Sequence, residues 1–134
     1  MLRDSLIPSL MLTLSRNIHE PYPQRIFEVG KTFLAGRSNV EEYWTLAAAL
    51  AHKDTSYTEA KSYLQALLRT LLDLELETKM VVNAMLADGR AAEIAVKKRN
   101  VGIVGEVSQQ VIDNFKLRVP VSIFELNISK VLEG

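Results

Sequence analysis

The segment from Ser56 to Leu71 is the feature that most constrains what this chain can fold into. It opens with Ser56-Tyr-Thr-Glu59, a capping box in which the serine oxygen and the glutamate carboxylate each accept a hydrogen bond from an otherwise unpaired backbone N–H. Its apolar residues then recur at spacings of three and four: Ala60, Tyr63, Leu64, Leu67, Leu68 and Leu71. This pattern predicts an amphipathic helix that packs flat on a sheet.

Strand-like segments lie on both sides of this helix. Before it, residues 25–33 alternate in polarity and residues 43–51 form a more uniformly apolar run, which predicts a central strand. After it, strands are expected at 79–86, 92–97, 101–107 and 119–126, with a hairpin turn at Arg99-Asn100. Helices are expected at 8–19, after Ser108 and at 128–132, and a turn at 36–39. This order predicts one α+β domain over residues 1–134, an antiparallel sheet with helices that can cover one face.

The composition excludes several classes of function. Sixteen Lys and Arg residues balance sixteen Asp and Glu residues, so no surplus charge attracts nucleic acid or an anionic membrane. Cysteine is absent, which excludes disulfides, thiolate catalysis and thiolate metal ligands. The apolar N-terminus is interrupted by Asp4, Ser5 and Pro8, and no apolar run approaches the roughly 20 residues of a membrane helix. We therefore expect a cytoplasmic chain without membrane contact.

Three glutamates inside predicted strands are the candidate binding residues: Glu28, Glu106 and Glu125. A carboxylate among apolar residues is costly to desolvate unless it is paired or faces water. One hypothesis is a shared acidic cluster on one sheet face that binds an ammonium group or a metal ion. The alternative, favoured because single alternating glutamates are ordinary on half-exposed sheets, is solvation or pairing with arginines. The candidate partners are Arg3, Arg25 and Arg90.

The remaining polar motifs form no complete catalytic constellation. His19 and His52 lack the spacing of metal ligands, and no Gly-x-Ser-x-Gly turn is present, so neither a metal site nor a serine nucleophile is predicted. Lys97-Lys98-Arg99 could contact RNA phosphate. Cationic residues at a hairpin more often protect strand edges and keep a chain soluble, and the neutral net charge favours that interpretation.

Five segments share their order and residues with one known family. They are Leu2-Arg-Asp-Ser-Leu-Ile-Pro-Ser-Leu-Met11 with Asn17, Tyr22-Pro-Gln-Arg-Ile-Phe-Glu-Val-Gly30, Gly89-Arg-Ala-Ala-Glu-Ile94, Val101-Gly-Ile-Val-Gly-Glu-Val-Ser108 with Val111 to Phe115, and Pro120-Val-Ser-Ile-Phe-Glu-Leu126. Together they span nearly the whole chain and resemble the C-terminal catalytic-like module of phenylalanyl-tRNA synthetase beta subunits. The Tyr22-Pro-Gln-Arg25 string is similar to the archaeal and eukaryotic type.

This resemblance implies a partial class II aminoacyl-tRNA synthetase-like module. Catalytic relatives carry an arginine just after the strand that matches residues 27–33, and a Gly-rich stretch ending in arginine near the last strand. Here Thr32-Phe-Leu-Ala35 and Phe124-Glu-Leu-Asn-Ile-Ser129 stand at those places. Cationic groups supply much of the stabilisation in phosphoryl and adenylyl transfer, so the resemblance implies a chain that is inactive alone and holds no cofactor.

In this family a catalytic alpha subunit performs the phenylalanine-tRNA ligase reaction with ATP and magnesium, inside a heterotetramer. The resemblance implies the alpha subunit as partner, and contact with tRNA-Phe only through the parent complex. The family's first interface helix and strand lie upstream of the matched region, so we expect a fragment of a longer chain whose exposed apolar surface favours self-association. The alternative is a free-standing regulatory module that binds an amino acid on the sheet face beside Glu28.

Overall fold

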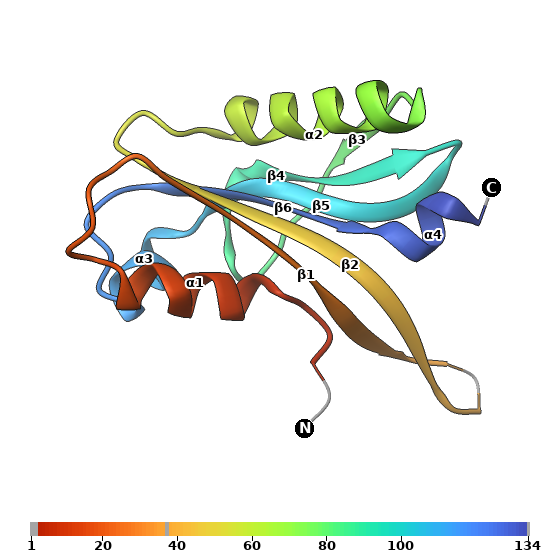
Figure 1. Cartoon of the computed structure of the whole chain (residues 1–134), viewed down its shortest axis with the longest axis horizontal. Helices are drawn as coiled ribbons and strands as arrows, with labels where there is room; N and C mark the ends of the chain where they lie inside the picture. Colours follow the sequence, from red (N-terminus) through yellow and green to blue (C-terminus); the bar gives the residue numbers. More distant parts are fainter. Residues whose placement is uncertain (1–2, 37, 134) are drawn as a thin grey trace.

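The computed structural model describes residues 3–36 and 38–133 and shows a six-stranded antiparallel sheet with helices on both faces (Figure 1). The strands are β1 (Gln24–Ala35), β2 (Val40–Ala51), β3 (Glu77–Met80), β4 (Leu86–Val96), β5 (Arg99–Val107) and β6 (Val121–Asn127). The helices are α1 (Ile7–Arg16), α2 (Tyr57–Leu72), α3 (Gln109–Asn114) and α4 (Ile128–Leu132). The strand order across the sheet is β1-β2-β6-β5-β4-β3. The predicted α+β class and antiparallel sheet are confirmed.

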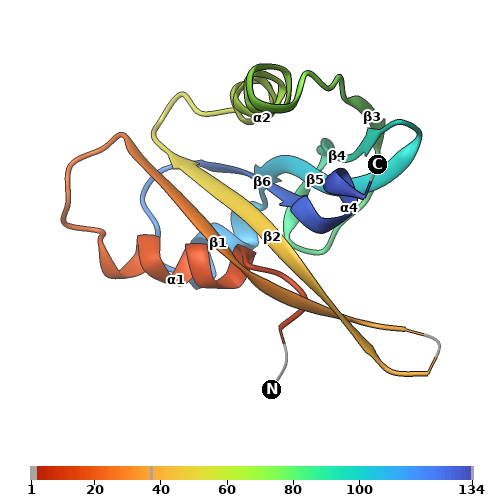
Figure 2. The same ribbon diagram turned by 45° about the vertical axis from the view of Figure 1, so that its right-hand side comes forward.

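β1 and β2 form a long hairpin whose tip projects beyond the rest of the sheet (Figure 2). β2 also pairs with β6 over residues 45–51, so it is central, as its apolar run predicts. β1 pairs with β2 alone and forms one edge of the sheet. The predicted turn at 36–39 is closed by the Gly36 N–H, which donates to the Asn39 carbonyl, and Arg37 lies outside the described residues.

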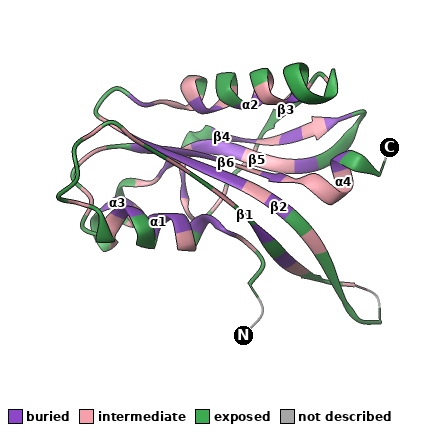
Figure 3. Ribbon diagram, in the orientation of Figure 1, coloured by how far each residue is buried: buried purple, intermediate pink, exposed green. Residues whose placement is uncertain are grey.

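Helices cover both faces of the sheet rather than the one face expected (Figures 1 and 3). α1 and α3 cover one face, over a core that includes Ala47, Ala49 and Ile123. α2 covers the other face, over a core that includes Leu50 and Phe124. The cause lies in β2, where successive residues are apolar, so that burial of one face alone would leave half of them in water. We call these the α1 face and the α2 face.

The two longer helices follow the predicted start signals but differ in detail. α1 ends at Arg16, three residues before the predicted end, because the Asn17 N–H already closes the helix on the carbonyls of Thr13 and Leu14. α2 begins as predicted, with Ser56 Oγ accepting the Glu59 N–H at 3.2 Å. The other predicted bond of the capping box, from a backbone N–H to the Glu59 carboxylate, is wrong, since that carboxylate binds the side chains of His52 and Thr55.

The strand predicted at residues 79–86 is wrong. β3 ends at Met80, and the chain then turns with Asn83 Oδ1 accepting the Met85 N–H at 2.9 Å. A short side-chain amide that binds nearby backbone competes with strand pairing, which explains why the apolar run does not continue as a strand.

The remaining boundaries move by a few residues. β4 begins at Leu86, before the predicted start at 92, and runs through Gly89, which has a φ of 77° beside a register shift and so forms a bulge inside the strand. The β4–β5 turn lies at Lys97 and Lys98, both with positive φ, rather than at Arg99-Asn100. α4 has the predicted bounds, and α3 follows Ser108 as predicted.

Candidate functional site

Glu125 caps the first turn of α1 from the sheet below it. It lies on the α1 face of β6, opposite Ala47. One carboxylate oxygen accepts the Leu6 N–H at 2.6 Å and the Ser5 hydroxyl at 2.9 Å. Backbone N–H groups at a helix start have no partner within the helix, so this carboxylate supplies one. Burial raises the pKa of Glu125, and the bonds from Leu6 and Ser5 oppose that rise only in part.

Glu28 lies on the same face, on β1, also opposite Ala47. Its carboxylate lies 3.3 Å from the Arg3 guanidinium and accepts the Ser9 hydroxyl at 2.9 Å. One strand separates Glu28 from Glu125, which corresponds to roughly 10 Å between their backbones. Each carboxylate thus has its own partners, all supplied by the N-terminal segment and α1.

Glu106 lies on the opposite side of the sheet, because its partner Ser122 points to the α2 face. It contacts Arg90 at 2.9 Å and accepts the Tyr57 N–H at 2.9 Å, at the start of α2. Arg25 shares that face, opposite Leu50, so it does not approach Glu28. The structure therefore does not bring the three predicted glutamates together, and residues 3–36 and 38–133 contain no group of three potential metal-binding side chains.

A polar network at the junction of β2 and α2 is a feature that sequence reasoning missed. The Glu59 carboxylate accepts hydrogen bonds from His52 Nε2 and the Thr55 hydroxyl, both at 2.7 Å, and Thr55 also bonds the Ser122 hydroxyl at 2.6 Å. The Asp54 N–H donates to His52 Nδ1, which leaves the ring proton on Nε2. Burial raises the pKa of Glu59, but the bonds from Thr55 and His52 outweigh it, and the pKa lies below its ordinary value.

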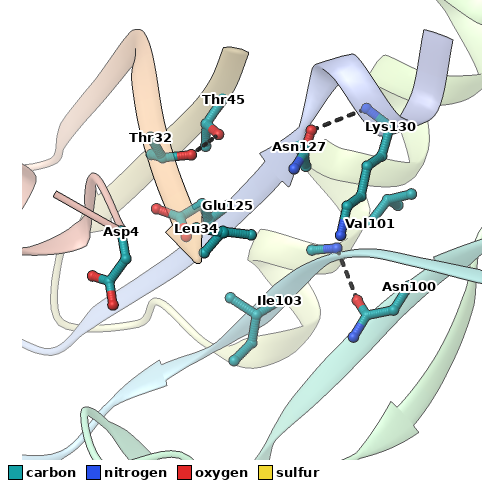
Figure 4. A pocket seen from close by; sticks show the side chains of 11 residues that line it. Asp4, Thr32, Leu34, Thr45, Asn100, Val101, Ile103, Glu125, Asn127 and Lys130 are labelled. Carbon is teal, nitrogen blue, oxygen red and sulfur yellow. Dashed lines mark hydrogen bonds between the residues drawn. The ribbon is translucent and has the colours of Figure 1, made fainter. Parts of the chain in front are cut away.

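A cavity of about 270 Å³ opens on the α1 face beside Glu125 (Figure 4). Asp4 and Glu125 lie on one side of it, and Asn100 and Lys130 lie on the other. Thr32 and Thr45 also line the cavity, and their buried hydroxyls bond each other at 2.9 Å.

The charges of this cavity limit what it can hold. Among its described lining residues Lys130 is the single cation, whereas a triphosphate needs several positive groups or metal ions. A small molecule with an ammonium group at one end and a carboxylate at the other suits the observed separation of charges better. Serine and histidine do not occur among the described lining residues, so the cavity offers no Ser–His nucleophile pair.

The α2 face carries several exposed apolar side chains, which we call the apolar face. It comprises Phe27, Val29 and Trp44 on the β1–β2 hairpin, Tyr63, Leu71 and Leu72 on α2, and Leu132 on α4. Leu71 is 68% exposed and Val29 is 58% exposed. Exposed apolar groups of this extent mark interaction surfaces in folded proteins.

Two apolar cavities are lined in part by members of the apolar face. One, of about 360 Å³, lies between α2 and the sheet and is lined by Phe27, Tyr63 and Leu71. The other, of about 190 Å³, shares Leu71 and extends to Leu72 and Leu132. The predicted helix stripe included Tyr63 and Leu71 as buried residues, and that part of the prediction is wrong. α2 packs on β5 and β6 through Ala60, Leu64 and Leu68, which leaves Tyr63 and Leu71 beside the cavity.

The fold is shared with a solved structure. The chain superposes on a structure described as "Desulfitobacterium hafniense PylSc, a pyrrolysyl tRNA synthetase", with a TM-score of 0.71 and 18% sequence identity, covering 97% of this chain and 48% of the other. At that identity the similarity shows the fold alone, which is that of an aminoacyl-tRNA synthetase domain. The sequence then matches the family described as "Phenylalanyl tRNA synthetase beta chain CLM domain" over residues 1–128. The chain belongs to this family.

Individual relatives agree with the family. The chain is similar to the phenylalanine–tRNA ligase beta subunits of Pyrococcus horikoshii (44% identity over 93% of this chain), Thermococcus sibiricus (41% over 99%) and Haloarcula marismortui (39% over 95%). It spans only 22–24% of the length of these relatives. No helix within residues 3–36 and 38–133 has the length and apolar content needed to cross a membrane.

Proposed function

We propose that this chain is a non-catalytic structural part of the phenylalanine–tRNA ligase beta subunit that packs against the catalytic alpha subunit. The observation that carries the proposal is the apolar face, which occurs on a chain that belongs to this beta-subunit family. An apolar side chain gains about 1.5–3 kcal/mol when it is fully buried, so a partner that covers Leu71 and Val29 would be bound with useful affinity.

The polar residues support a scaffold rather than a catalyst. The carboxylates of Glu28 and Glu125 hold α1 on the sheet, and that of Glu106 holds the start of α2, so all three have structural roles that need no ligand. In this proposal the chain is a single class II-like module of a longer, cytoplasmic, archaeal- or eukaryotic-type beta subunit, C-terminal in that subunit. ATP and magnesium are bound in the parent heterotetramer, and tRNA-Phe is reached only through it.

The test uses two exposed leucines on helices of opposite faces. Leu71→Lys places a charge in the apolar face, whereas Leu12→Lys places the same charge on α1, where the leucine is 41% exposed. We expect the chain to co-purify with the alpha subunit from the same organism, Leu71→Lys to weaken binding at least about tenfold, which is 1.4 kcal/mol, and Leu12→Lys to bind normally. Equal effects of both variants would remove the apolar face from the proposal.

A second measurement addresses the absence of catalysis. The chain alone is expected to show no phenylalanine-dependent exchange of pyrophosphate into ATP, because the cavity beside Glu125 cannot neutralise a triphosphate. Robust exchange by the purified chain, lost in a Lys130→Ala variant, would overturn the proposal.

The cavity of mixed charge favours a second candidate function, that of an amino-acid-binding regulatory module. Glu28, beside which that ligand was expected, is occupied by Arg3 and Ser9, so the site would lie between Glu125 and Lys130 instead. Calorimetric titration with phenylalanine and the other amino acids tests this function. A micromolar signal that Lys130→Ala removes would favour it, and the absence of heat with every amino acid would eliminate it.

A further inference from the structure

The edge of the sheet at β1 has a short window in which the backbone has no partner. The Phe33 N–H donates outward to the Arg3 carbonyl, and the Lys31 carbonyl accepts outward from the Arg3 side chain. Since outward and inward groups alternate along a strand, those of Arg25, Phe27 and Val29 also point away from β2. Within the described residues no hydrogen bond to these three backbone units is present on that side.

Both ends of this window are closed. Arg3 covers the edge at Lys31 and Phe33. At the other end Pro23 has no N–H to offer, so a pairing strand would gain little beyond Arg25. The open window therefore runs from Arg25 to Val29 and is centred on Phe27. Natural edge strands are protected by charge, proline or a bulge. Here Pro23 and Arg3 close the two ends, and Arg25 is the one charged residue among the three whose backbone groups point outward.

We propose that β1 pairs antiparallel with β1 of a second copy of this chain, about a two-fold axis at Phe27. In this register Phe27 lies opposite its own copy, and Arg25 lies opposite Val29 of the second copy. Each opposed pair exchanges two hydrogen bonds, which gives about six N–H···O bonds across the axis. Pro23 then faces Lys31 of the second copy. Pro23 has no N–H and the Lys31 carbonyl is already bonded by Arg3, so no further pairing is needed there. A two-fold interface needs such self-complementarity, and this window has it.

The side chains fit the same register. Phe27 and Val29 are 56% and 58% exposed, and the pairing places the two Phe27 rings side by side on the α2 face. Arg25 opposes an apolar residue, so like charges do not face each other, and the net charge of the chain is zero. The axis is perpendicular to the sheet and leaves both α2 helices on one side, so this edge contact shares Phe27 and Val29 with the apolar face but does not involve Leu71 on α2.

The experiment is sedimentation velocity of the full chain at increasing concentration. We expect the mass to rise from 15.0 kDa towards twice that value, 30.0 kDa, as the concentration approaches about 1 mM. Val29→Pro removes one outward N–H without touching the bonds to β2 and is expected to shift the protein to monomer. Phe27→Lys leaves the backbone intact, places two ammonium groups opposite each other and is also expected to give monomer.

Leu71→Lys is the matched control, because it charges the apolar face without altering the edge, and it is expected to remain dimeric. Circular dichroism of each variant establishes that it is folded, and if Val29→Pro is not, Phe27→Lys decides. A monomeric wild-type chain up to about 1 mM, or a dimer that only Leu71→Lys abolishes, would overturn the proposal. Leu71→Lys is expected to weaken binding of the alpha subunit while leaving the dimer intact, so the two proposals fail separately.

Discussion

The two faces of the sheet differ in how far the helices cover their apolar residues. On the α1 face, α1 closes the core, and the carboxylates of Glu125 and Glu28 bind groups at the start of the helix. On the α2 face, α2 covers the centre of the sheet but leaves Leu71 and the hairpin residues Phe27 and Val29 in water. The chain's own helices cover the core of the α1 face, whereas these three apolar side chains stay exposed on the α2 face.

This difference shows which contacts maintain the fold and which are available to a partner. Residues such as Phe124, 1% exposed, and Leu64, fully buried, stabilise the chain on the same face on which Phe27 and Leu71 do not. Stability and binding are therefore separable by mutation within a single face.

The largest effect is expected from Phe124→Ala. This ring is in the centre of the α2-face core, and loss of a buried aromatic side chain leaves a cavity that costs about 3–5 kcal/mol of the free energy of unfolding. Phe27→Ala, at a ring that is 56% exposed, is the matched control and is expected to cost less than about 1 kcal/mol. Chemical denaturation measures both, and similar losses would contradict the division between core and apolar face.

The next effect is expected from Glu125→Ala on the α1 face. Removing the carboxylate leaves the Leu6 N–H and the Ser5 hydroxyl without their partner, which costs about 1–3 kcal/mol. Glu28→Ala is the control, because its ion pair with Arg3 is partly exposed and is worth about 0–1 kcal/mol. If Glu28→Ala proved the more damaging change, the cap on α1 would not be the main polar support of that face.

Ser56→Ala tests how α2 is attached, with a loss of about 1 kcal/mol expected because the Glu59 N–H loses its cap. Ser62→Ala, at an exposed position within α2, is the control and is expected to change stability by no more than about 0.5 kcal/mol. Thermal unfolding followed by circular dichroism compares the two serines directly.

A smaller effect is expected on the pH dependence of stability, which should differ between Glu125 on the α1 face and Glu59 at the start of α2. Because burial holds the pKa of Glu125 above its ordinary 4.5, the folded chain binds more protons than the unfolded chain between the two values. This group's contribution to stability is present below pH 4.5 and is lost as the pH rises through the folded-state pKa. Glu125→Gln keeps an acceptor for Leu6 and removes the titration.

The melting temperature of Glu125→Gln relative to wild type is therefore expected to be more favourable at pH 7 than at pH 4. Glu59→Gln is expected to behave oppositely, because the pKa of Glu59 is lowered and its contribution is lost as the pH falls. Parallel curves for wild type and Glu125→Gln would show that this carboxyl group does not titrate differently on folding.

Local patterns in the sequence predicted the elements, and tertiary partners decided the rest. The order of helices and strands, the central place of β2 and the bounds of α4 follow from periodicity and capping. The strand at 79–86 failed because the Asn83 side chain forms a bond that apolar spacing does not show. The apolar stripe of α2 was predicted correctly as a pattern, but periodicity does not show which of its residues contact the sheet and which line a cavity beside it.

The sequence predicted which glutamates lie in strands, but not which of them lie on the same face of the sheet. The sequence placed Glu28, Glu106 and Glu125 in strands, but the register that sets their faces depends on pairings between distant strands. Ser5 and Ser9, which bind two of these glutamates, gave no signal in the sequence because their partners are 120 and 19 residues away.

The smallest effect on stability is expected from Leu71→Ala, and it is the most informative about the apolar face. A leucine that is 68% exposed has little to lose on truncation, so the free energy of unfolding should change by no more than about 0.5 kcal/mol. Leu64→Ala, seven residues earlier on the same helix and fully buried, should cost about 2–5 kcal/mol. Chemical denaturation measures both variants.

A residue that contributes nothing to folding, yet belongs to a group of exposed apolar side chains, is costly to keep in water unless it is covered in the assembled protein. If Leu71→Ala proved as destabilising as Leu64→Ala, Leu71 would belong to the core, and the apolar face would shrink to the hairpin. If instead its stability is unchanged while binding of the alpha subunit falls, the side chain acts in recognition alone. Leu64 would then report on the stability of the fold, and Leu71 on binding of the partner.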